Sequence, residues 1–390
     1  MRIRYLLMNA YAVGGTNRTV VNMANALASH HDVEIVSVWR ERATPAFAID
    51  PRVRLRALVD MLQTPGWRRR AEAPARRLRS RLVPVQEVRY DRFNVLTDLR
   101  LTCYLRSLRD GVLVTTRPAL NLLSARYAPA TVVRVGQEHL HHARHKPELA
   151  REIRRWYPRL DAVTVLTEAD ERAYRAALGP AATRVARIPN GLPVAGAART
   201  SGEEKVIVAA GRLVRSKGFD LLIEAFELVA PSQPDWNLKI FGGGKNREAI
   251  RRQIERSPVR DRVHLMGPTG HLEDELAAAS IFVLSSRHEG FGMVIVEAMS
   301  HGLPVVSFDC PVGPREIITH GRDGLLACPD DPRALAAAMD TLMADDRLRR
   351  EMGAQAVQKA RRYDVEAVRP VWERLLAELA ATPDDEVNTV

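Results

Sequence analysis

The feature that most constrains the fold is an alternation of short apolar runs with amphipathic segments. Residues 3–8 are apolar except for Arg4, and a glycine pair follows at Gly14 and Gly15. Apolar residues then recur at helical spacing over 20–27 before a second apolar run begins at Val33. This order predicts a strand, a turn, a helix and a second strand. Repeated units of this kind form parallel sheets with helices on both faces, so the sequence predicts an α/β protein.

The alternation continues along the chain and restarts once. In the first half, further strands are expected over 112–114, 131–135 and 162–166. In the second half we expect strands over 206–210, 238–241, 263–266, 281–284 and 305–308, and helices over 219–229, 247–255, 272–279 and 293–299. Two Rossmann-like domains in tandem account for this pattern, with ligands bound at the carboxyl ends of the strands, in the cleft between the domains.

Domain boundaries are suggested by a stretch rich in Pro, Gly, Ala, Ser and Thr over 189–202, which we interpret as a linker. We expect an N-terminal domain over 1–193 and a C-terminal domain over 203–365. A helix over 366–382 is expected to return to the N-terminal domain. Residues 383–390 are expected to form a flexible tail.

Two acids frame the strongest motif of the second half. Glu289 and Glu297 are separated by seven residues, and Gly290 and Gly292 follow close behind the first acid. We place Glu289 at the carboxyl edge of the sheet and Glu297 two turns into the next helix. Glycines at a helix N-terminus let a ligand approach backbone amides, which favours anions and polar hydroxyls. An exposed loop acid and an ordinary surface acid are the alternative.

A basic turn over 211–218 follows the first strand of the second half and contains Arg212 and Lys217. Both cations could bind a pyrophosphate at the N-terminus of the next helix, Arg through its planar fork and Lys as a point charge. The turn lacks the GxxxxGK[ST] pattern of a Walker A loop. A solvated basic turn without a ligand is the alternative.

Four histidines, His139, His141, His142 and His145, follow the strand expected over 131–135. No CxxC or HExxH pattern accompanies them, so we expect no metal site, and solvated loop histidines are the alternative to a functional role. The pair before the first helix, Gly14 and Gly15, suits a phosphate or sugar cradle or a plain tight turn. A full GxGxxG pattern is missing there, which argues against a dinucleotide-dependent redox enzyme.

Taken together, Arg212, Lys217, Glu289 and Glu297 resemble the donor site of glycosyltransferase family 4, and the resemblance covers nearly the whole chain. Members of this family have the GT-B fold, in which two Rossmann-like domains flank a deep interdomain cleft, and they retain the anomeric configuration. The resemblance implies that Arg212 and Lys217 hold the donor diphosphate. It also implies that Glu289 contacts the transferred sugar and that Glu297 binds the nucleotide ribose.

The resemblance implies that the N-terminal domain over 1–193 binds the acceptor and that the C-terminal domain over 203–365 binds the nucleotide-sugar donor. It also implies roles for further residues. His139 aligns with the histidine that the family places near the anomeric carbon, which completes a catalytic set with Glu289, Arg212 and Lys217. The turn around Gly243 is similar to the one beside the nucleotide, and Met266 lies in a loop similar to the one that contacts the base. The remaining donor-binding residues that the resemblance implies are Gly15, Gly290, Phe291 and Gly292.

Charge is distributed unevenly. Residues 1–195 hold 33 Lys and Arg against 17 Asp and Glu, a net charge of +16, whereas the rest of the chain carries −5. The densest basic segment, 67–81, holds seven arginines and one acid, Glu72. It could lie on an anionic membrane, although we expect Pro74 to interrupt its helix, and a solvated basic face is the alternative. We expect no nucleic acid partner, because no recognised motif is present.

Three cysteines, Cys103, Cys310 and Cys328, lie far apart in the sequence, which favours buried free thiols in a reducing compartment. No stretch reaches the roughly 18 apolar residues of a membrane-spanning helix, and the first apolar run is too short for a signal peptide. We therefore expect a cytoplasmic protein, with peripheral contact to the cytoplasmic face of a membrane as an option.

These inferences predict a retaining glycosyltransferase for cell-envelope glycans, which moves a sugar from a nucleoside diphosphate donor to a glycan, polyol or lipid-linked acceptor. We expect no cofactor and no metal, because Arg212 and Lys217 would stabilise the leaving diphosphate. Two alternatives stay open. One is an inositol-phosphate N-acetylglucosaminyltransferase-like enzyme, which the turn Gly15-Thr16-Asn17 favours, and the other is a non-catalytic nucleotide-sugar-binding protein.

Overall fold

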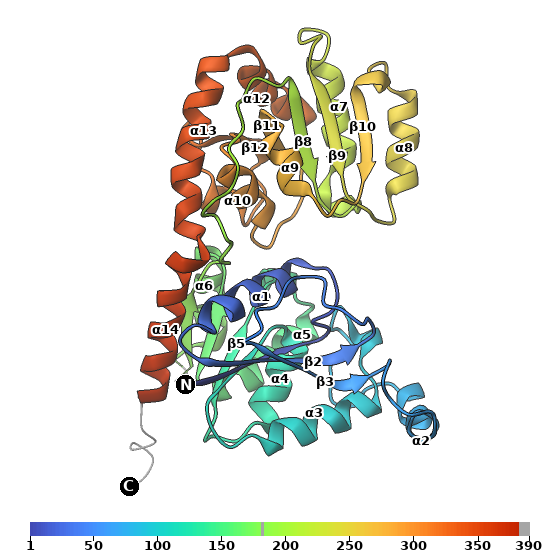
Figure 1. Ribbon diagram of the computed structural model, residues 1–390, viewed down its shortest axis with the longest axis vertical. Coiled ribbons are helices and arrows are strands. Elements are labelled where there is room, and N and C mark those ends of the chain that lie inside the picture. The colour runs from blue at the N-terminus through green and yellow to red at the C-terminus, as the bar shows by residue number, and fades with distance from the viewer. Residues whose placement is uncertain (181–182, 382–390) are drawn as a thin grey trace. The chain divides into compact units, whose positions relative to one another are not determined.

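The computed structural model describes residues 1–180 and 183–381. The chain divides into two compact units: unit 1 is Met1–Gly191 together with the chain from Val365 onward, and unit 2 is Leu192–Asp364. Each unit contains one parallel sheet with helices packed against it (Figure 1). The segment 383–390, for which we expected a flexible tail, lies outside the described residues.

Unit 1 has a seven-stranded sheet of order β3-β2-β1-β4-β5-β6-β7. Its strands are β1 (Arg2–Leu7), β2 (Asp32–Arg40), β3 (Arg54–Asp60), β4 (Val112–Thr115), β5 (Val133–Gln137), β6 (Ala162–Val165) and β7 (Arg184–Arg187). Its α-helices are α1 (Gly15–Leu27), α2 (Gly66–Arg77), α3 (Val95–Ser107), α4 (Pro118–Tyr127), α5 (Pro147–Trp156), α6 (Glu168–Leu178) and α14 (Val365–Ala381). Its 3-10 turns are η1 (Tyr90–Arg92), η2 (His142–Arg144) and η3 (Tyr157–Arg159).

Both faces of this sheet are buried, as the side chains of β1 show. Ile3, Tyr5 and Leu7 lie in a core with α1 and α14, whereas Leu6 lies in a second core with α3 and α4. Successive residues of a strand point to opposite faces, so a strand covered on both sides must be apolar nearly throughout. The near-continuous apolar runs of the sequence are the signature of this burial.

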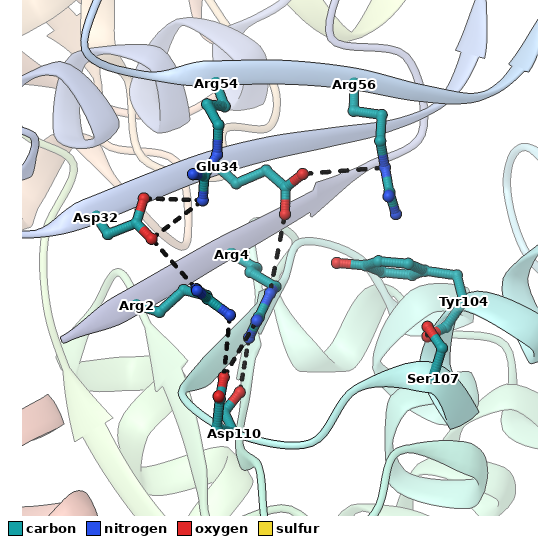
Figure 2. A network of polar contacts seen from close by, with 9 residues as sticks. All are labelled: Arg2, Arg4, Asp32, Glu34, Arg54, Arg56, Tyr104, Ser107 and Asp110. Atoms are coloured by element: carbon teal, nitrogen blue, oxygen red, sulfur yellow. Dashed lines mark hydrogen bonds and ion pairs between the residues drawn. The ribbon is translucent and has the colours of Figure 1, made fainter.

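Charged residues on β1 are accommodated by a network at the amino end of the sheet (Figure 2). The Arg4 guanidinium lies 3.8 Å from the Glu34 carboxylate of β2 and 3.2 Å from the Asp110 carboxylate before β4. Arg2 pairs in the same way with Asp32 at 3.2 Å. Opposite charges on neighbouring strands stabilise the pairing, so these residues hold β1, β2 and β4 in register rather than weakening the sheet.

Helix α14 supplies part of the core of unit 1, although it follows unit 2 in the sequence. Val368, Trp372, Leu375 and Leu376 are buried among side chains of β1 and α1. Their spacing of three and four residues places them on one face of the helix. The residues after unit 2 therefore complete the hydrophobic core that the first strand begins.

Unit 2 has a six-stranded sheet of order β10-β9-β8-β11-β12-β13. Its strands are β8 (Val206–Ala210), β9 (Asn237–Phe241), β10 (Val263–Gly267), β11 (Ile281–Leu284), β12 (Val305–Phe308) and β13 (Gly324–Ala327). Its α-helices are α7 (Phe219–Val229), α8 (Arg247–Arg256), α9 (Leu272–Ala277), α10 (Met293–Ser300), α11 (Pro314–Ile317), α12 (Pro332–Ala344) and α13 (Asp346–Ala360). Its 3-10 turns are η4 (Arg215–Lys217), η5 (Arg260–Arg262) and η6 (Arg361–Tyr363).

Three strands that the apolar runs did not single out, β3, β7 and β13, all lie at sheet edges. Two of them are rich in arginine, with the sequences RLRALVD and RVAR. An edge strand is less buried, and charges on it also discourage pairing with other chains. The pattern that identifies a central strand is therefore weak at β3 and β7, whereas β13, with the sequence GLLA, is apolar and mostly buried but only four residues long.

The expectation that Pro74 interrupts the helix of the basic segment 67–81 is wrong. The helix continues through Pro74, which is exposed, instead of ending there. A proline removes one backbone hydrogen bond and clashes with the preceding turn, which a short, solvent-facing helix tolerates here. No helix within 1–180 or 183–381, α2 included, combines the length and apolar composition that crossing a membrane requires.

The expectation of buried free cysteines holds only in part. All three thiols are free, but only Cys310 is buried, so the prediction of buried thiols is wrong for Cys103 and Cys328. Cys103 lies one turn after Leu99 on the outer face of α3, where Leu99 is itself 57% exposed. Cys328 follows the edge strand β13, so neither position is covered by a further layer of the fold.

Removing the Trp372 side chain tests the contribution of α14 to unit 1. We expect Trp372→Ala to lower the free energy of unfolding by about 3–5 kcal/mol, because a fully buried aromatic side chain is replaced by a cavity. Urea unfolding measures the change. The adjacent Val371 is 40% exposed, so Val371→Ala is the control and should change stability by less than about 0.5 kcal/mol. Equal effects of the two variants would contradict this placement of α14.

Candidate functional site

In unit 2, the strand order reverses between β8 and β11, which are neighbours in the sheet. Ligands of open α/β sheets bind at such a switch point, beyond the carboxyl ends of the strands. The loop after β8 is the basic turn 211–218, and the loop after β11 carries Glu289. The fold thus brings both sequence motifs to one edge of one sheet.

Lys217 and Glu289 form a direct ion pair across these two loops. The Ser286 hydroxyl donates a second hydrogen bond to the same carboxylate oxygen at 2.7 Å. The side chain of Glu289 is 8% exposed and that of Lys217 is 19% exposed. The ammonium keeps further N–H donors for an anion, and the carboxylate is held in one orientation, where it can accept hydrogen bonds from hydroxyl groups.

The two loops approach closely because position 218 is glycine. Gly218 has a φ of 63°, and a Cβ atom there would lie 1.9 Å from the Ser285 carbonyl oxygen. The Ser285 hydroxyl donates to the Lys217 carbonyl at 3.0 Å, and the Arg287 N–H donates to the Ser216 carbonyl at 2.9 Å. A left-handed glycine with no side chain is what this contact requires.

Arg212 lies in the same turn, and its side chain is exposed. Among residues 1–180 and 183–381, no hydrogen bond or ion pair holds its guanidinium. The neighbouring Leu213 N–H donates to the Gly243 carbonyl at 3.0 Å, so the loop after β9 packs against this turn. Within the described residues, Arg212 is therefore a cation without a partner, at the same carboxyl edge of the sheet as Lys217.

The residues after Glu289 lead into α10. Gly292 precedes that helix with a φ of 96°, and Phe291 is buried, with its ring edge-on to Tyr363. The helix begins at Met293, so Glu297 lies one turn into it rather than the expected two. Gly290 is partly exposed in the loop between Glu289 and Phe291.

Met266 lies at the far side of this edge, on β10, and its side chain is 48% exposed. Strand β9 separates β10 from β8 in the sheet. The Gly242 N–H donates to the Gly267 carbonyl at 2.8 Å, which joins the ends of β9 and β10. Met266 and Gly243 therefore flank the carboxyl end of β9, whereas Lys217 and Glu289 flank the switch point.

The loop after β12 adds residues that the sequence motifs did not identify. Gly313 has a φ of 100°, and a Cβ atom there would lie 2.7 Å from the Phe291 carbonyl oxygen. Burial, reinforced by the charge of Glu289, raises the pKa of the nearby Cys310 thiol to about 12, so it stays protonated. Gly313 thus supports the acidic loop, as Ser286 of the loop after β11 does. A Gly-Pro pair at 313–314 is a turn signal that could have indicated the first of these positions, whereas no sequence motif indicates Ser286.

In unit 1, the strand order reverses between β1 and β4. Gly15 is the first residue of α1, directly after the loop that follows β1. The Asn17 amide closes this loop, because it donates to the carbonyls of Asn9 and Ala12, each at 2.7 Å. A ligand role of Gly15 remains a prediction, and the structure adds Asn17 as the residue that shapes the turn.

His139 follows β5 at the same carboxyl edge of unit 1. Its Nε2 atom is buried and has no hydrogen-bond partner among the described residues. Burial, and next the charge of Arg117, lower the pKa of His139 to about 4, so the imidazole is neutral at pH 7. A neutral ring with an uncommitted nitrogen can accept or donate a hydrogen bond, depending on its tautomer.

The other histidines of this segment are tied to α6. The Nδ1 atom of His141 lies 2.5 Å from the Asp170 carboxylate, and Nε2 of His145 lies 3.0 Å from the Tyr174 hydroxyl. The His145 side chain is 2% exposed, so the alternative of solvated loop histidines is wrong for this residue. Within 1–180 and 183–381, no three His, Cys, Asp or Glu side chains group as ligands of a metal ion.

Comparison with known proteins agrees with this architecture. The family described as Glycosyltransferase Family 4 matches residues 13–195, and the family described as Glycosyl transferases group 1 matches residues 197–359. All but the last four residues of the first match lie in unit 1, and the second match lies in unit 2. Together the two matches account for most of the chain.

Individual proteins are similar over nearly all of the chain. An exopolysaccharide phosphotransferase of Streptomyces coelicolor is 37% identical over 99% of this chain, which spans 41% of that protein's length. An uncharacterised glycosyltransferase of Haemophilus influenzae is 25% identical over 96% of this chain and 99% of its own. TarM of S. aureus, solved with UDP, matches with a TM-score of 0.77 and 17% identity over 96% of this chain and 100% of its own. The chain thus belongs to the glycosyltransferases of the family 4 type and has the GT-B fold.

Proposed function

We propose that this chain is a retaining glycosyltransferase that takes a sugar from a nucleoside diphosphate donor bound to unit 2. The observation that carries the proposal is the pairing of Lys217 with Glu289 at the switch point of unit 2, beside the uncommitted Arg212. Two cations, Lys217 and Arg212, beside the oriented carboxylate of Glu289 suit a ligand that has a diphosphate at one end and hydroxyl groups at the other. TarM, which has a similar fold, was solved with UDP.

The chemistry follows from where charge develops. When the bond between the sugar and the phosphate breaks, negative charge accumulates on the diphosphate, and fixed cations stabilise that charge. We assign this role to Lys217 and Arg212. We assign the sugar hydroxyls to Glu289 and the nucleotide ribose to Glu297, with Gly243, Met266 and the backbone of 290–292 completing the nucleotide contacts.

We assign unit 1 to the acceptor and to the reacting face of the sugar. His139 presents a neutral imidazole with a free nitrogen, which suits a hydrogen bond to a hydroxyl group without adding a competing charge. Gly15 would lie against the donor phosphate or the acceptor. We propose a glycan, polyol or lipid-linked acceptor of the cell envelope, in line with the exopolysaccharide and the α-GlcNAc-glycerol named for two similar proteins. Three free cysteines suit a cytoplasmic site of action.

Removing either proposed diphosphate cation tests the donor site. We expect Arg212→Ala and Lys217→Ala each to lower kcat/KM at least about tenfold, because one electrostatic contact to developing charge is worth roughly 3 kcal/mol. Steady-state turnover of a nucleotide sugar measures the effect. Arg215→Ala, which removes an exposed arginine of the same turn, is the matched control. If all three variants keep wild-type turnover, the diphosphate site is wrongly assigned.

We propose that the reaction needs no metal, because Lys217 and Arg212 supply the positive charge that a divalent ion would otherwise provide. Full turnover is therefore expected after dialysis against excess EDTA. The measurement compares initial rates with and without added Mg²⁺ or Mn²⁺. A complete loss of turnover that either ion restores would contradict the proposal.

We also propose that α2 binds an anionic membrane surface. The helix projects at the rim of unit 1 in Figure 1, and Trp67 on it is 74% exposed. Arg68, Arg70 and Arg77 are exposed beside it, whereas Arg76 turns inward and pairs with Glu72 at 3.0 Å. An exposed tryptophan among arginines suits the headgroup region of an anionic bilayer.

Sedimentation with anionic liposomes tests this surface. We expect the combined variant Arg68→Gln, Arg70→Gln and Arg77→Gln to lose most of the binding and to keep donor turnover. Binding of the wild type should weaken as salt rises, because the Debye length is about 10 Å at 0.1 M salt. Three exposed arginines of α8, Arg251, Arg252 and Arg256, provide the control substitutions. Equal binding of both triple variants, or no binding of the wild type at low salt, would contradict the proposal.

A further inference from the structure

A chain of buried polar side chains lies beneath the segment that carries His139, and the proposed donor chemistry does not use it. The Thr115 hydroxyl at the end of β4 donates to the Asn121 amide oxygen of α4 at 2.6 Å. The Asn121 amide nitrogen donates to the Glu138 carboxyl at 2.8 Å and lies 3.0 Å from the Tyr157 hydroxyl. This chain joins β4, α4, the end of β5 and η3 within unit 1.

Glu138 is the centre of this chain and directly precedes His139. Its side chain is 1% exposed, and the Tyr157 hydroxyl donates to its Oε1 atom. The Oε2 atom is buried without a hydrogen-bond partner among the described residues and lies 3.9 Å from Nε2 of His145. Within the described ranges, no arginine or lysine pairs with this carboxyl, so an ionised Glu138 would be an almost uncompensated buried charge.

The packing around Glu138 depends on a glycine in β5. A Cβ atom at Gly136 would lie 2.9 Å from the Leu160 side chain and 3.2 Å from the Asn121 side chain. Only the missing side chain lets Asn121 reach across the sheet face to the carboxyl group. The local sequence of β5 is thus adapted to the polar chain rather than to apolar packing alone.

Contacts on both sides of His139 fix the backbone that carries it. The Glu138 N–H donates to the Thr164 carbonyl of β6 at 2.9 Å, and the His142 N–H donates to the Asp170 carboxylate at 2.9 Å. In the part of the chain that the structure describes, the imidazole of His139 itself has no partner at Nε2. Its position is therefore set by its neighbours in the segment and not by a bond from that nitrogen.

We propose that Glu138 is a positioning residue for His139. Its carboxyl group, hydrogen-bonded to Asn121 and Tyr157, anchors the carboxyl end of β5 and so determines where the His139 imidazole lies. This inference rests on the role proposed for His139 in sugar transfer. It adds a residue that touches neither the donor nor the acceptor.

The protonation of Glu138 follows from its surroundings. The polar and charged groups that face it are Asn121 of α4, Tyr157 of η3, His145 of the same segment, Asp170 and Tyr174 of α6, and the more distant Glu87 and Arg117. Burial raises the pKa of Glu138 to about 8, so the carboxyl group is neutral at pH 7. Ionisation at higher pH introduces a buried charge beside His139 and should lower turnover.

Two substitutions separate positioning from general stability. We expect Glu138→Leu to lower kcat at least about tenfold, because misplacement of a reacting group by about 1 Å is costly, while the KM for the donor stays unchanged. Glu138→Gln should recover most of kcat at pH 7 and should remove the alkaline decline of kcat near pH 8. Glu148→Gln, at an exposed carboxylate of α5, is the control, and it should keep that decline.

Thermal unfolding provides a readout without turnover. The pKa of Glu138 is 4.5 in the unfolded chain and about 8 in the folded protein. The contribution of this carboxyl group to stability is therefore fully present below pH 4.5 and is lost as the pH rises to about 8. The unfolding midpoint of Glu138→Gln should therefore rise relative to wild type between these values and level off above them. The low pKa values of His139 and His145 affect both proteins equally and cancel in the difference.

The outcomes distinguish this inference from the proposed function. If His139→Ala loses kcat but Glu138→Leu does not, the positioning role is wrong and the proposed function stands. If His139→Ala keeps wild-type kcat, the role of His139 fails, and the inference fails with it. Should Glu138→Leu not fold, the Gln variant decides, because an unchanged alkaline decline in that variant would overturn the inference.

Discussion

Burial of both faces of each parallel sheet is the constraint on which the rest of this structure depends. A strand covered on both sides has no room for unpaired polar side chains. Strand β11 (Ile281–Leu284) is an example, because all its residues are both buried and apolar. Polar residues are left to the ends of the strands, where the chain leaves the core. The chemistry of both units therefore gathers at the carboxyl edges, next to the strand pairs where the sheet order reverses.

The two edges are built on different electrostatic principles. In unit 2 the charges of Lys217 and Glu289 compensate each other, and the exposed Arg212 adds a positive charge for an anion. In unit 1 burial keeps Glu138 and His139 neutral, so these two residues at the end of β5 offer hydrogen bonds rather than charges. This contrast is consistent with our proposal that unit 2 binds the donor diphosphate and that His139 of unit 1 contacts hydroxyl groups.

Sequence patterns locate the chemistry better than they describe its geometry. The interval between Glu289 and Glu297 and the basic turn around Lys217 are enough to identify the two loops of unit 2. Their contact depends on Gly218, whose left-handed backbone lets the loops touch across 72 residues of sequence. Such a contact follows from strand order, which local patterns do not encode.

The sequence by itself determined the α/β class, the central strands and the positions of the candidate motifs, because apolar periodicity and glycine placement act over a few residues. Only the tertiary structure decided the edge strands β3 and β7, whose charged sequences carry little apolar signal, and the four-residue edge strand β13. It also decided that His145 is buried and that Glu138 is held by Asn121 and Tyr157. Those environments arise when α4, η3 and α6 pack together, and burial, which sets their pKa values, is a property of that packing.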